Sequence, residues 1–270
     1  MKVEVLLSCM YQKDACIIEK NHIQTDVIVV NQCDSDSIEE FTFVNNKGQT
    51  CNAKFICTTQ RGLSRSRNMA IANAHAGHIC LICDDDEILT DGYEDLILSG
   101  YSEYEDADVM AFSLNWNGFG KTYSSESYKL SFKETLRVCS VQITFKVDSI
   151  IKNNICFDVM LGSGTGNGAG EENRFMLDCR RCGLNMYYYP NNIATINISE
   201  SQWFKGFTEQ YFKNHGWATR RVFRNDFLAL GIIIYYALSK RTLYKAEIST
   251  FKAIKYMLKG FFEKRQHEYM

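Results

Sequence analysis

The distribution of apolar residues predicts strands and helices that alternate along the chain. Two short apolar runs rich in β-branched residues, Val3 to Ser8 and Asp26 to Asn31, flank the more helical stretch Asp14 to Asn21. A strand, a helix and a second strand in this order favour parallel pairing of the two strands. A third strand is predicted in "KFICTT", around Phe55. The start of the chain is therefore typical of an α/β sheet.

The same pattern continues through the middle of the chain. Residues 62–77 are rich in Ala and Arg and end in glycine, which predicts a helix with a glycine C-cap. "HICLIC" predicts a buried strand that ends at Asp84, and "TDGYEDLILSGY" predicts a helix capped by Thr90 or Asp91. Further strands are predicted in "VMAFSLNW", "VCSVQITFKV" and "LNMYYYP", and the helix "EENRFMLDCRRCG" is predicted before the last of them.

Three adjacent carboxylates, Asp84 to Asp86, directly follow the buried strand. Their mutual repulsion is tolerable on a solvated turn or around a cation, and no Lys or Arg stands beside them in the sequence. In open α/β sheets, ligands bind beyond the carboxyl ends of the parallel strands, which is where these residues fall. Mg²⁺ and Mn²⁺ prefer oxygen ligands and share them with phosphates. The position therefore favours a metal–phosphate site over an acidic surface turn.

A glycine-rich segment, Gly162 to Gly170, precedes the helix that begins with Glu171 and Glu172. Its glycines occupy even positions only, so it lacks the G-x-G-x-x-G spacing of dinucleotide-binding loops, and no Gly-Lys-Ser/Thr follows to make a P-loop. It predicts either a loop that moves over a site or a mobile surface loop. The two glutamates are either first-turn acids that the helix dipole stabilises or a source of a catalytic base.

Two blocks of this sequence together resemble family 2 glycosyltransferases of the bacterial surface-polysaccharide type. "RGLSRSRNMAIANAHAGHICLICDDDEIL" is similar to the SRxRN-type helix start, strand and acidic D-x-D motif of that family. "FDVMLGSGTGNGAGEENRFMLDCRRCGLNMYYYP" is similar to its acceptor-side segment. The resemblance runs from about Val3 to about Trp203. It implies an α/β fold of the GT-A type, a Rossmann-like, mostly parallel sheet flanked by helices.

The resemblance also implies a reaction and a set of site residues. The reaction is inverting, metal-dependent transfer of a hexose-type sugar from a nucleotide-diphosphate sugar, foremost a UDP-sugar, to a hydroxyl of a glycan or lipid-linked acceptor. Mn²⁺ or Mg²⁺ would be held by Asp86 and Asp84, and Glu172 would be the catalytic base, with Glu171 beside it. The remaining implied residues are Asn31, Asp34, Arg67, Asp84 and Asp85 near the donor nucleotide, and Gly166, Gly168 and Gly170 in the acceptor loop.

Two other functions match parts of the pattern. A nucleotidylyltransferase would carry a glycine-rich, basic loop after the first strand, and "LLSCMYQKDAC" has no glycine there, which argues against it. A catalytically degenerate sugar-nucleotide-binding or scaffold protein of a glycan-assembly complex stays open. "NQCD" stands where the family usually has "DDGS", and no histidine follows the "YYYP" strand in "NNIATINISESQW".

Charge divides the 270-residue chain unevenly. From Lys213 to Met270 there are 12 Lys+Arg against 4 Asp+Glu, a net charge of +8, whereas the rest of the chain carries −10. The stripe Ile248, Phe251, Ile254, Leu258 and Phe261, with lysines among its members, predicts a basic amphipathic helix. Such a helix would either lie on an anionic membrane surface or pack against its own domain or a second copy in a dimer. We therefore expect a transferase domain in residues 1–203 and a helical C-terminal region in residues 204–270.

The cysteine content predicts the redox state and the cellular location of the protein. Eleven cysteines in a chain whose N-terminus predicts a strand rather than a secretory leader favour reduced thiols and a cytoplasmic location, including the inner face of the plasma membrane. Two C-x-x-C spacings, Cys80/Cys83 and Cys179/Cys182, favour core cysteines over a zinc site. We expect no nucleic-acid partner.

Overall fold

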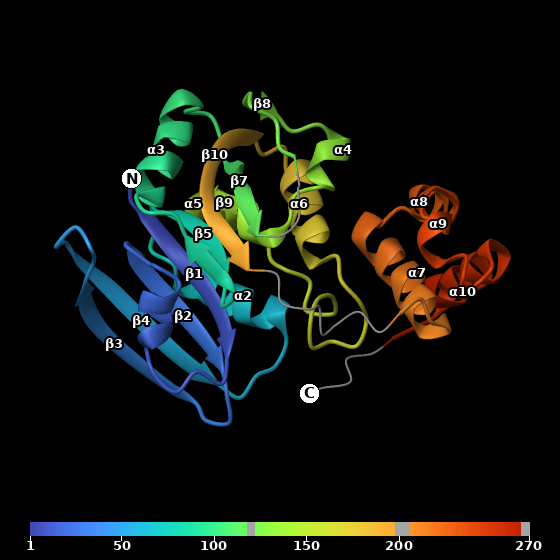
Figure 1. Cartoon of the computed structure of the whole chain (residues 1–270), viewed down its shortest axis with the longest axis horizontal. Helices are drawn as coiled ribbons and strands as arrows, with labels where there is room; N and C mark the ends of the chain where they lie inside the picture. Colours follow the sequence, from blue (N-terminus) through green and yellow to red (C-terminus); the bar gives the residue numbers. More distant parts are fainter. Residues whose placement is uncertain (118–121, 198–205, 266–270) are drawn as a thin grey trace. The chain divides into compact units, whose positions relative to one another are not determined.

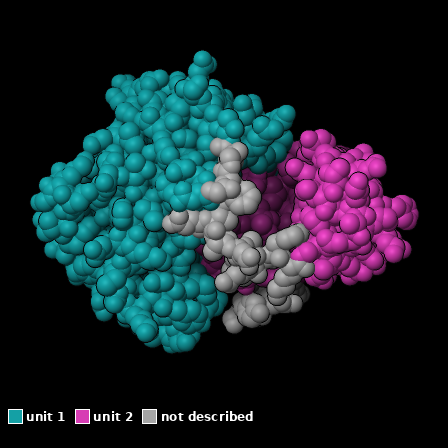
Figure 2. All heavy atoms as spheres, viewed as in Figure 1, with its two compact units in different colours: residues 1–61, 65–156, 178–199 teal, residues 62–64, 157–177, 200–270 magenta. Residues whose placement is uncertain are grey.

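The computed structural model describes residues 1–117, 122–197 and 206–265 (Figure 1), and the chain forms two compact units (Figure 2). Unit 1 comprises residues 1–61, 65–156 and 178–199, and unit 2 comprises residues 62–64, 157–177 and 200–270. The predicted boundary between residues 203 and 204 lies in the segment 198–205, outside the described residues.

Unit 1 is built on a ten-stranded sheet. Its strands are β1 (Val3–Met10), β2 (Asp26–Gln32), β3 (Ser37–Val44), β4 (Thr50–Thr58), β5 (Ile79–Asp84), β6 (Glu87–Leu89), β7 (Val109–Asn117), β8 (Tyr128–Lys129), β9 (Ile143–Lys146) and β10 (Met186–Asn197). The helices between them are α1 (Cys16–Lys20), α2 (Leu63–Asn73), α3 (Tyr93–Glu103), α4 (Phe132–Thr135), the 3₁₀ turn Ser140–Gln142, α5 (Val147–Lys152) and α6 (Glu171–Arg181).

The order and direction of the strands bring several carboxyl ends to one edge of this sheet. The order is β3-β4-β2-β1-β5-β9-β7-β10-β6, with β8 paired to β10 (Figure 1). Strands β4, β2, β1, β5, β7 and β10 run in one direction, and β3, β9, β6 and β8 run in the other. The predicted β-α-β opening and mostly parallel sheet are confirmed. The carboxyl ends of β4, β2, β1 and β5 therefore meet at one edge.

The central strands are buried on both faces, as parallel strands covered by helices should be. Alternate residues of β1, among them Val5 and Leu7, pack into one apolar cluster with Val29 and Leu81 of its neighbours and Ile97 of α3. The intervening Leu6 is also buried, with 1% of its surface exposed. The continuous apolar runs in the sequence reflect this burial on both faces.

The structure corrects several local predictions. The helix predicted to run to Gly77 ends at Asn73, and α3 is capped by Gly92 in the left-handed region (φ 75°) rather than by the side chain of Thr90 or Asp91. The last strand before α5 begins only at Ile143 because the 3₁₀ turn precedes it. Strand β3, which the sequence did not predict, pairs antiparallel to β4, and its residues are mostly exposed.

Unit 2 contains the glycine-rich segment, the start of α6, and four further helices. These are α7 (Glu209–Phe223), α8 (Asp226–Ser239), α9 (Arg241–Tyr244) and α10 (Thr250–Phe262), which confirms a helical C-terminal region. Helices α7 and α10 cross with backbone against backbone. A Cβ atom added to Gly216 would overlap the carbonyl oxygen of Met257, and one added to Gly260 would overlap that of Lys213. Only glycine fits at either position.

The predicted amphipathic helix exists as α10, but its buried face is not the predicted stripe. Ala253, Met257, Gly260 and Phe261 are buried, whereas the side chain of Phe251 is 78% exposed. The face that packs against α7 is therefore rotated from the stripe. Of the stripe, Phe261 is buried, Ile248, Ile254 and Leu258 are half-buried, and Phe251 is exposed. Within the described residues, no helix combines the length and the apolar character that a membrane span requires.

Candidate active site

The acidic triplet occupies the predicted place at the carboxyl end of β5. Strand β5 ends at Asp84, which stands in register with Ser8 of β1, and a tight turn leads to β6. The backbone carbonyl of Asp84 accepts a hydrogen bond from the Asn21 amide at 2.8 Å, and that of Asp85 accepts one from Lys20 Nζ at 3.3 Å. The last residue of α1 and the residue after it thus fix the turn from one side.

Arg67 supplies the positive charge that the local sequence lacks. It lies on α2 with 2% of its side chain exposed, and its Nη2 donates to both carboxylate oxygens of Asp84 at 3.0 Å. The same nitrogen donates to Ser140 Oγ at 2.9 Å. A buried, hydrogen-bonded ion pair of this kind has one favoured geometry. Two residues predicted near the donor nucleotide, Arg67 and Asp84, are therefore in direct contact.

Asp85 and Asp86 differ from Asp84 in having no such partner. Among the residues that the structure describes, neither carboxylate forms an ion pair with Lys or Arg. The pKa of each is raised, first by partial desolvation and then by the negative charge of Asp84. Carboxylate oxygens crowded by like charges are the ligands that a hard divalent cation prefers. The residues of the turn therefore fit an Mg²⁺ or Mn²⁺ ion.

A fourth acid, Glu87, lies beneath the turn and was not predicted from the sequence. It is buried, and its Oε2 accepts a hydrogen bond from the backbone N–H of Asp84 at 3.4 Å. Burial raises the pKa of Glu87 well above its usual range, and the charge of Asp84 adds to the effect. A neutral carboxyl at this position supports the turn without adding a fourth negative charge.

The raised pKa of Glu87 leads to a pH prediction. Because the folded state binds this proton more tightly, its contribution to stability is complete below the unfolded pKa and is lost as pH rises through the raised, folded pKa. Glu87→Gln keeps the neutral shape, so its melting temperature should fall less than that of the wild type between pH 5 and pH 8. Each 1 kcal/mol corresponds to about 2–4 °C for a chain of this size. Exposed Glu19→Gln is the matched control, and equal slopes for Glu87→Gln and wild type would contradict the assignment.

Asn31 and Asp34 both lie near the carboxyl end of β2, but they have different roles there. Asn31 is buried, and its amide accepts from the backbone N–H of Gln12 at 3.0 Å and donates to the Gln12 carbonyl at 2.8 Å. It therefore shapes the loop after β1. Asp34 has an 83% exposed side chain and forms an ion pair of 2.7 Å with Arg61.

Tyr11 and Arg61 join Asp34 at this edge, although neither was predicted as a site residue; Arg61 opens the block "RGLSRSRN". The Arg61 guanidinium lies 5.5 Å from the centre of the Tyr11 ring, and its Nη2 donates to the Tyr11 hydroxyl at 3.4 Å. Arg61 Nη1 also donates to the carbonyls of Cys33 and Thr58. An aromatic ring, a guanidinium and a carboxylate together can stack on and hydrogen-bond a planar base. The available signal was their position just after β1 and β4.

The predicted acceptor-side residues lie in unit 2. The glycines of the segment have positive φ, with 71° at Gly166, 101° at Gly168 and 117° at Gly170, which side chains with a Cβ rarely adopt. The segment is also bound to itself, because Gly162 N–H donates to the Gly168 carbonyl at 2.9 Å. Asn214 of α7 donates to the Gly166 carbonyl at 3.1 Å. The segment therefore has a defined conformation.

The two glutamates at the start of α6 have unlike surroundings within unit 2. Glu171 is buried, its Oε2 accepts from Gly170 N–H at 3.1 Å, and its side chain fills the space beside Gly162. Glu172 is half-buried and accepts from the side-chain amide of Asn173 at 3.0 Å. Glu171 thus orders the glycine segment, and Glu172 is the more accessible carboxylate.

The cysteines form neither disulfides nor a predicted zinc site. All eleven are free thiols, and Cys80, Cys83 and Cys179 are buried. Burial is the first cause that raises the pKa of Cys80 and Cys83 well above the usual range. Burial confirms the interpretation as core cysteines for these three residues. It is wrong for Cys182, which is exposed.

Comparisons with known proteins give a likeness of structure. No protein-family model matches the chain, and no curated protein matches it. Fragment 1–349 of S. aureus TarS in complex with UDP-GlcNAc matches with a TM-score of 0.61 and 15% identity, over 92% of this chain and 74% of that chain. The chain shares its fold with TarS. This likeness and the sheet described above confirm the predicted fold class.

Two further structures of the same TarS fragment agree with this result. The fragment by itself matches with a TM-score of 0.63 and 14% identity, over 97% of this chain and 81% of that chain. Its complex with UDP matches with a TM-score of 0.60 and 15% identity, over 92% of this chain and 75% of that chain. At such low identities the likeness to TarS concerns the fold alone.

Proposed function

We propose that the protein is a family 2-like glycosyltransferase that moves a sugar from a nucleoside diphosphate sugar to an acceptor hydroxyl. The observation that carries the proposal is the acidic turn Asp84–Asp86 at the carboxyl end of β5, anchored by Arg67. This edge is where open α/β sheets bind ligands. The complexes of TarS with UDP-GlcNAc and UDP support a nucleotide-sugar donor, and a UDP-sugar is our first choice.

The donor nucleotide would lie along the edge formed by β4, β2, β1 and β5. Tyr11, Arg61 and Asp34 offer a stacking surface and hydrogen-bonding groups for the base. Asp84, held by Arg67, would lie near the ribose, and Asp85 would line the same turn. Asn31 would act indirectly, because its amide is engaged in folding the loop after β1.

A divalent cation is part of the proposal because the residues of the turn fit one. Asp86 would be its main ligand, since Arg67 already occupies both oxygens of Asp84 and leaves that carboxylate a lesser role. Mg²⁺ or Mn²⁺ at this place supplies positive charge against the diphosphate leaving group. Arg67 keeps the turn in one geometry, so the site is organised before the donor arrives.

The acceptor hydroxyl needs a base, and Glu172 is the carboxylate we assign to it. In a single inverting displacement, one carboxylate takes the proton from the hydroxyl as it attacks the sugar. Glu171 is committed to the glycine segment, whereas Glu172 is more accessible. The segment with Gly166, Gly168 and Gly170 would shape the acceptor side.

The test of the function is a donor screen with a chemical readout. Purified full-length protein with Mn²⁺ is mixed with UDP-, GDP- and ADP-sugars, thermal shifts are recorded, and released nucleoside diphosphate is then measured. Turnover of one donor, with release that rises when glycan or lipid-linked acceptors are added, supports the transferase. A donor that binds tightly and is never turned over with any acceptor supports the scaffold alternative instead.

We further propose that the C-terminal helices hold the enzyme against an anionic membrane surface, such as the inner face of the plasma membrane, where lipid-linked acceptors of polysaccharide synthesis would lie. Several large apolar side chains of α8 to α10 are exposed: Phe227 (89%), Tyr235 (66%), Leu243 (59%), Phe251 (78%) and Phe262 (67%). Lys252, Lys255 and Lys259 stand among those of α10. Apolar side chains framed by lysines suit the interface of an anionic bilayer.

Substituting two of these lysines should weaken membrane binding. Each Lys near an anionic surface contributes about 1 kcal/mol, so Lys252→Gln with Lys255→Gln should lower vesicle affinity about 30-fold. The measurement is flotation with phosphatidylglycerol-containing vesicles at low and high salt. The control variant, Lys13→Gln with Lys133→Gln, removes the same charge from exposed positions in unit 1. If both variants float alike, the C-terminal helices are not the anchor.

A further inference from the structure

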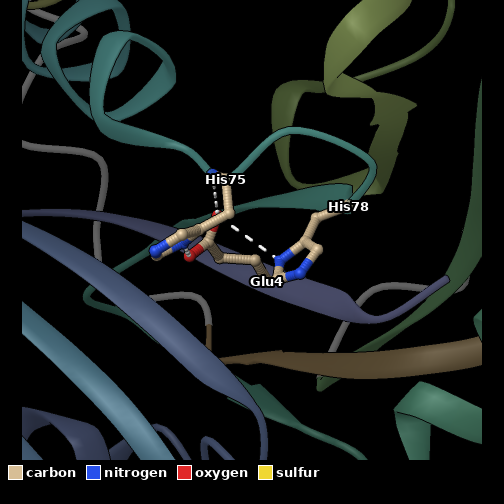
Figure 3. A group of neighbouring side chains, drawn as sticks. All are labelled: Glu4, His75 and His78. Carbon is tan, nitrogen blue, oxygen red and sulfur yellow. Dashed lines mark hydrogen bonds and ion pairs between the residues drawn. The ribbon is translucent and has the colours of Figure 1, made fainter.

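We propose that Glu4, His75 and His78 form a zinc site at the edge of the sheet opposite the acidic turn. Glu4 is the second residue of β1, and the two histidines lie in the turn between α2 and β5 (Figure 3). One ligand atom from each residue lies within 4.8 Å of the others. The site is at the amino ends of β1 and β5, whereas Asp84 ends β5 at its other end.

Glu4 is an unusual residue for its position, and this is the first argument for a cation. It stands in a central strand of the sheet with 1% of its side chain exposed, paired in register with Asp26 on one side and Cys80 on the other. A buried carboxylate needs a positive partner. Within the described residues, its carboxylate contacts the side chains of His75 and His78 and also accepts a hydrogen bond from the backbone N–H of His75 at 2.9 Å, so the two imidazoles are its only partners that can carry positive charge.

The second argument is an unsatisfied nitrogen that faces the carboxylate. His78 Nδ1 is buried and makes no hydrogen bond among the described residues, and it lies 3.9 Å from Glu4 Oε2. Figure 3 shows the His78 ring turned toward Glu4 and His75. A buried polar atom without a partner costs free energy. A cation between His78 Nδ1 and Glu4 would remove that cost.

The distances suit a zinc ion after small movements. His75 Nδ1 and Glu4 Oε1 form a hydrogen bond of 2.6 Å. Around tetrahedral Zn²⁺, with bonds near 2.0–2.1 Å, neighbouring ligand atoms lie about 3.3 Å apart. The observed distances to the two oxygens of the carboxylate, 2.6 Å from His75 Nδ1 to Oε1 and 3.9 Å from His78 Nδ1 to Oε2, lie on either side of that value. A zinc ion bound by both Nδ1 atoms would replace this hydrogen bond.

The three ligands and the hydrogen-bonded turn that carries the histidines favour Zn²⁺ over Mg²⁺, which we propose for the acidic turn. Two imidazoles and one carboxylate are nitrogen-rich ligands for zinc, whereas Mg²⁺ requires oxygen. The turn is held by Gly77 N–H, which donates to the Asp148 carboxylate at 3.1 Å, and by Val147 N–H, which donates to the His78 carbonyl at 3.1 Å. Zinc would thus tie the end of α2 to β1, with its fourth position open beside the exposed ring of His75.

Zinc binding to the full-length protein tests the proposal. The parent protein carries Cys16→Ser, Cys156→Ser and Cys182→Ser, which removes the exposed thiols that would bind zinc unspecifically. Competition with a chromophoric chelator should give one Zn²⁺ per chain, unaffected by excess Mg²⁺. His75→Gln and His78→Gln keep a hydrogen-bonding side chain and should each weaken zinc binding about tenfold or more. His22→Asn is the control, because asparagine tolerates the positive φ of 54° there.

Melting temperatures and the spectrum of bound Co²⁺ distinguish binding at this site from misfolding and from binding to thiols. Melting temperatures without metal show that each variant is folded, and added Zn²⁺ should raise the melting temperature of the parent and of His22→Asn only. Co²⁺ bound in place of zinc should lack the thiolate charge-transfer band. A parent that binds less than one Zn²⁺ per chain, or either glutamine variant with an affinity within tenfold of the parent, overturns the proposal. No nucleotide is present, so the result does not depend on the transferase activity.

Discussion

Replacement of Asp86 by alanine is expected to abolish the metal-dependent part of nucleotide binding while leaving the fold intact. Asp86 is exposed on the turn and has no ion pair with Lys or Arg among the described residues. Its pKa is raised first by partial desolvation and then by the repulsion from Asp84 and Asp85. Removing a repelled charge does not weaken the turn. A cation between turn and diphosphate contributes several kcal/mol, so UDP affinity in Mn²⁺ should fall about 100-fold or more.

Calorimetric titration with UDP, in Mn²⁺ and in chelator, measures this effect. Wild-type protein in chelator and Asp86→Ala in Mn²⁺ should have the same low affinity. Asp85→Ala is the matched comparison, because it removes the neighbouring carboxylate that the proposal does not make the main ligand. If Asp86→Ala keeps the full response to Mn²⁺, or if Asp85→Ala alone loses it, the assignment of the metal ligand is wrong.

Glu172→Gln is expected to remove transfer almost completely while donor binding stays nearly unchanged. Glutamine keeps the shape of the side chain but cannot take the proton from the acceptor hydroxyl, so the rate should fall by about 10²–10⁴. Glu171→Gln should have a smaller effect, because that side chain accepts from Gly170 N–H and fills the space beside Gly162, which an amide oxygen can largely reproduce.

Single-turnover transfer at saturating donor separates the two glutamates. The comparison uses wild type, Glu172→Gln and Glu171→Gln, with UDP affinity measured in parallel for each. A dead Glu171→Gln beside an active Glu172→Gln would move the base by one residue. Full rates in both variants would exclude a carboxylate base from this helix altogether.

Local patterns were sufficient to predict the sheet because its central strands are buried on both faces. The run "ICLIC" has no polar interruption, and strand β5 coincides with it. Strand β3 was missed for the opposite reason: as an edge strand it has mostly exposed residues, and its pairing with β4 is a tertiary fact. The cap of α3 was missed because Gly92 acts through its backbone conformation rather than a side chain.

Site residues could be predicted only where a motif carries them. Asp84 to Asp86 and Arg67 stand in recognisable blocks, but the contact of Arg67 Nη2 with both oxygens of Asp84 depends on how α2 packs. Tyr11 and Arg61 come from separate loops, and nothing in their local sequence connects them. Glu4 lies 71 residues before His75 in the chain. The available signal there was a charged residue within the apolar run "VEVLLS", together with the spacing His-x-x-His.

The close backbone contact between α7 and α10 connects the exposed face of α10 with the glycine segment of unit 2. Gly216 and Gly260 leave no room for even a methyl group, so the helices cannot slide along each other and keep the crossing. Asn214 of α7 binds the Gly166 carbonyl, and Arg265, just beyond α10, donates to Asn214 at 2.8 Å. A continuous series of backbone contacts and hydrogen bonds within unit 2 therefore joins α10 to the glycine segment. A membrane that binds the outer face of α10 would also act on the acceptor side of the proposed site.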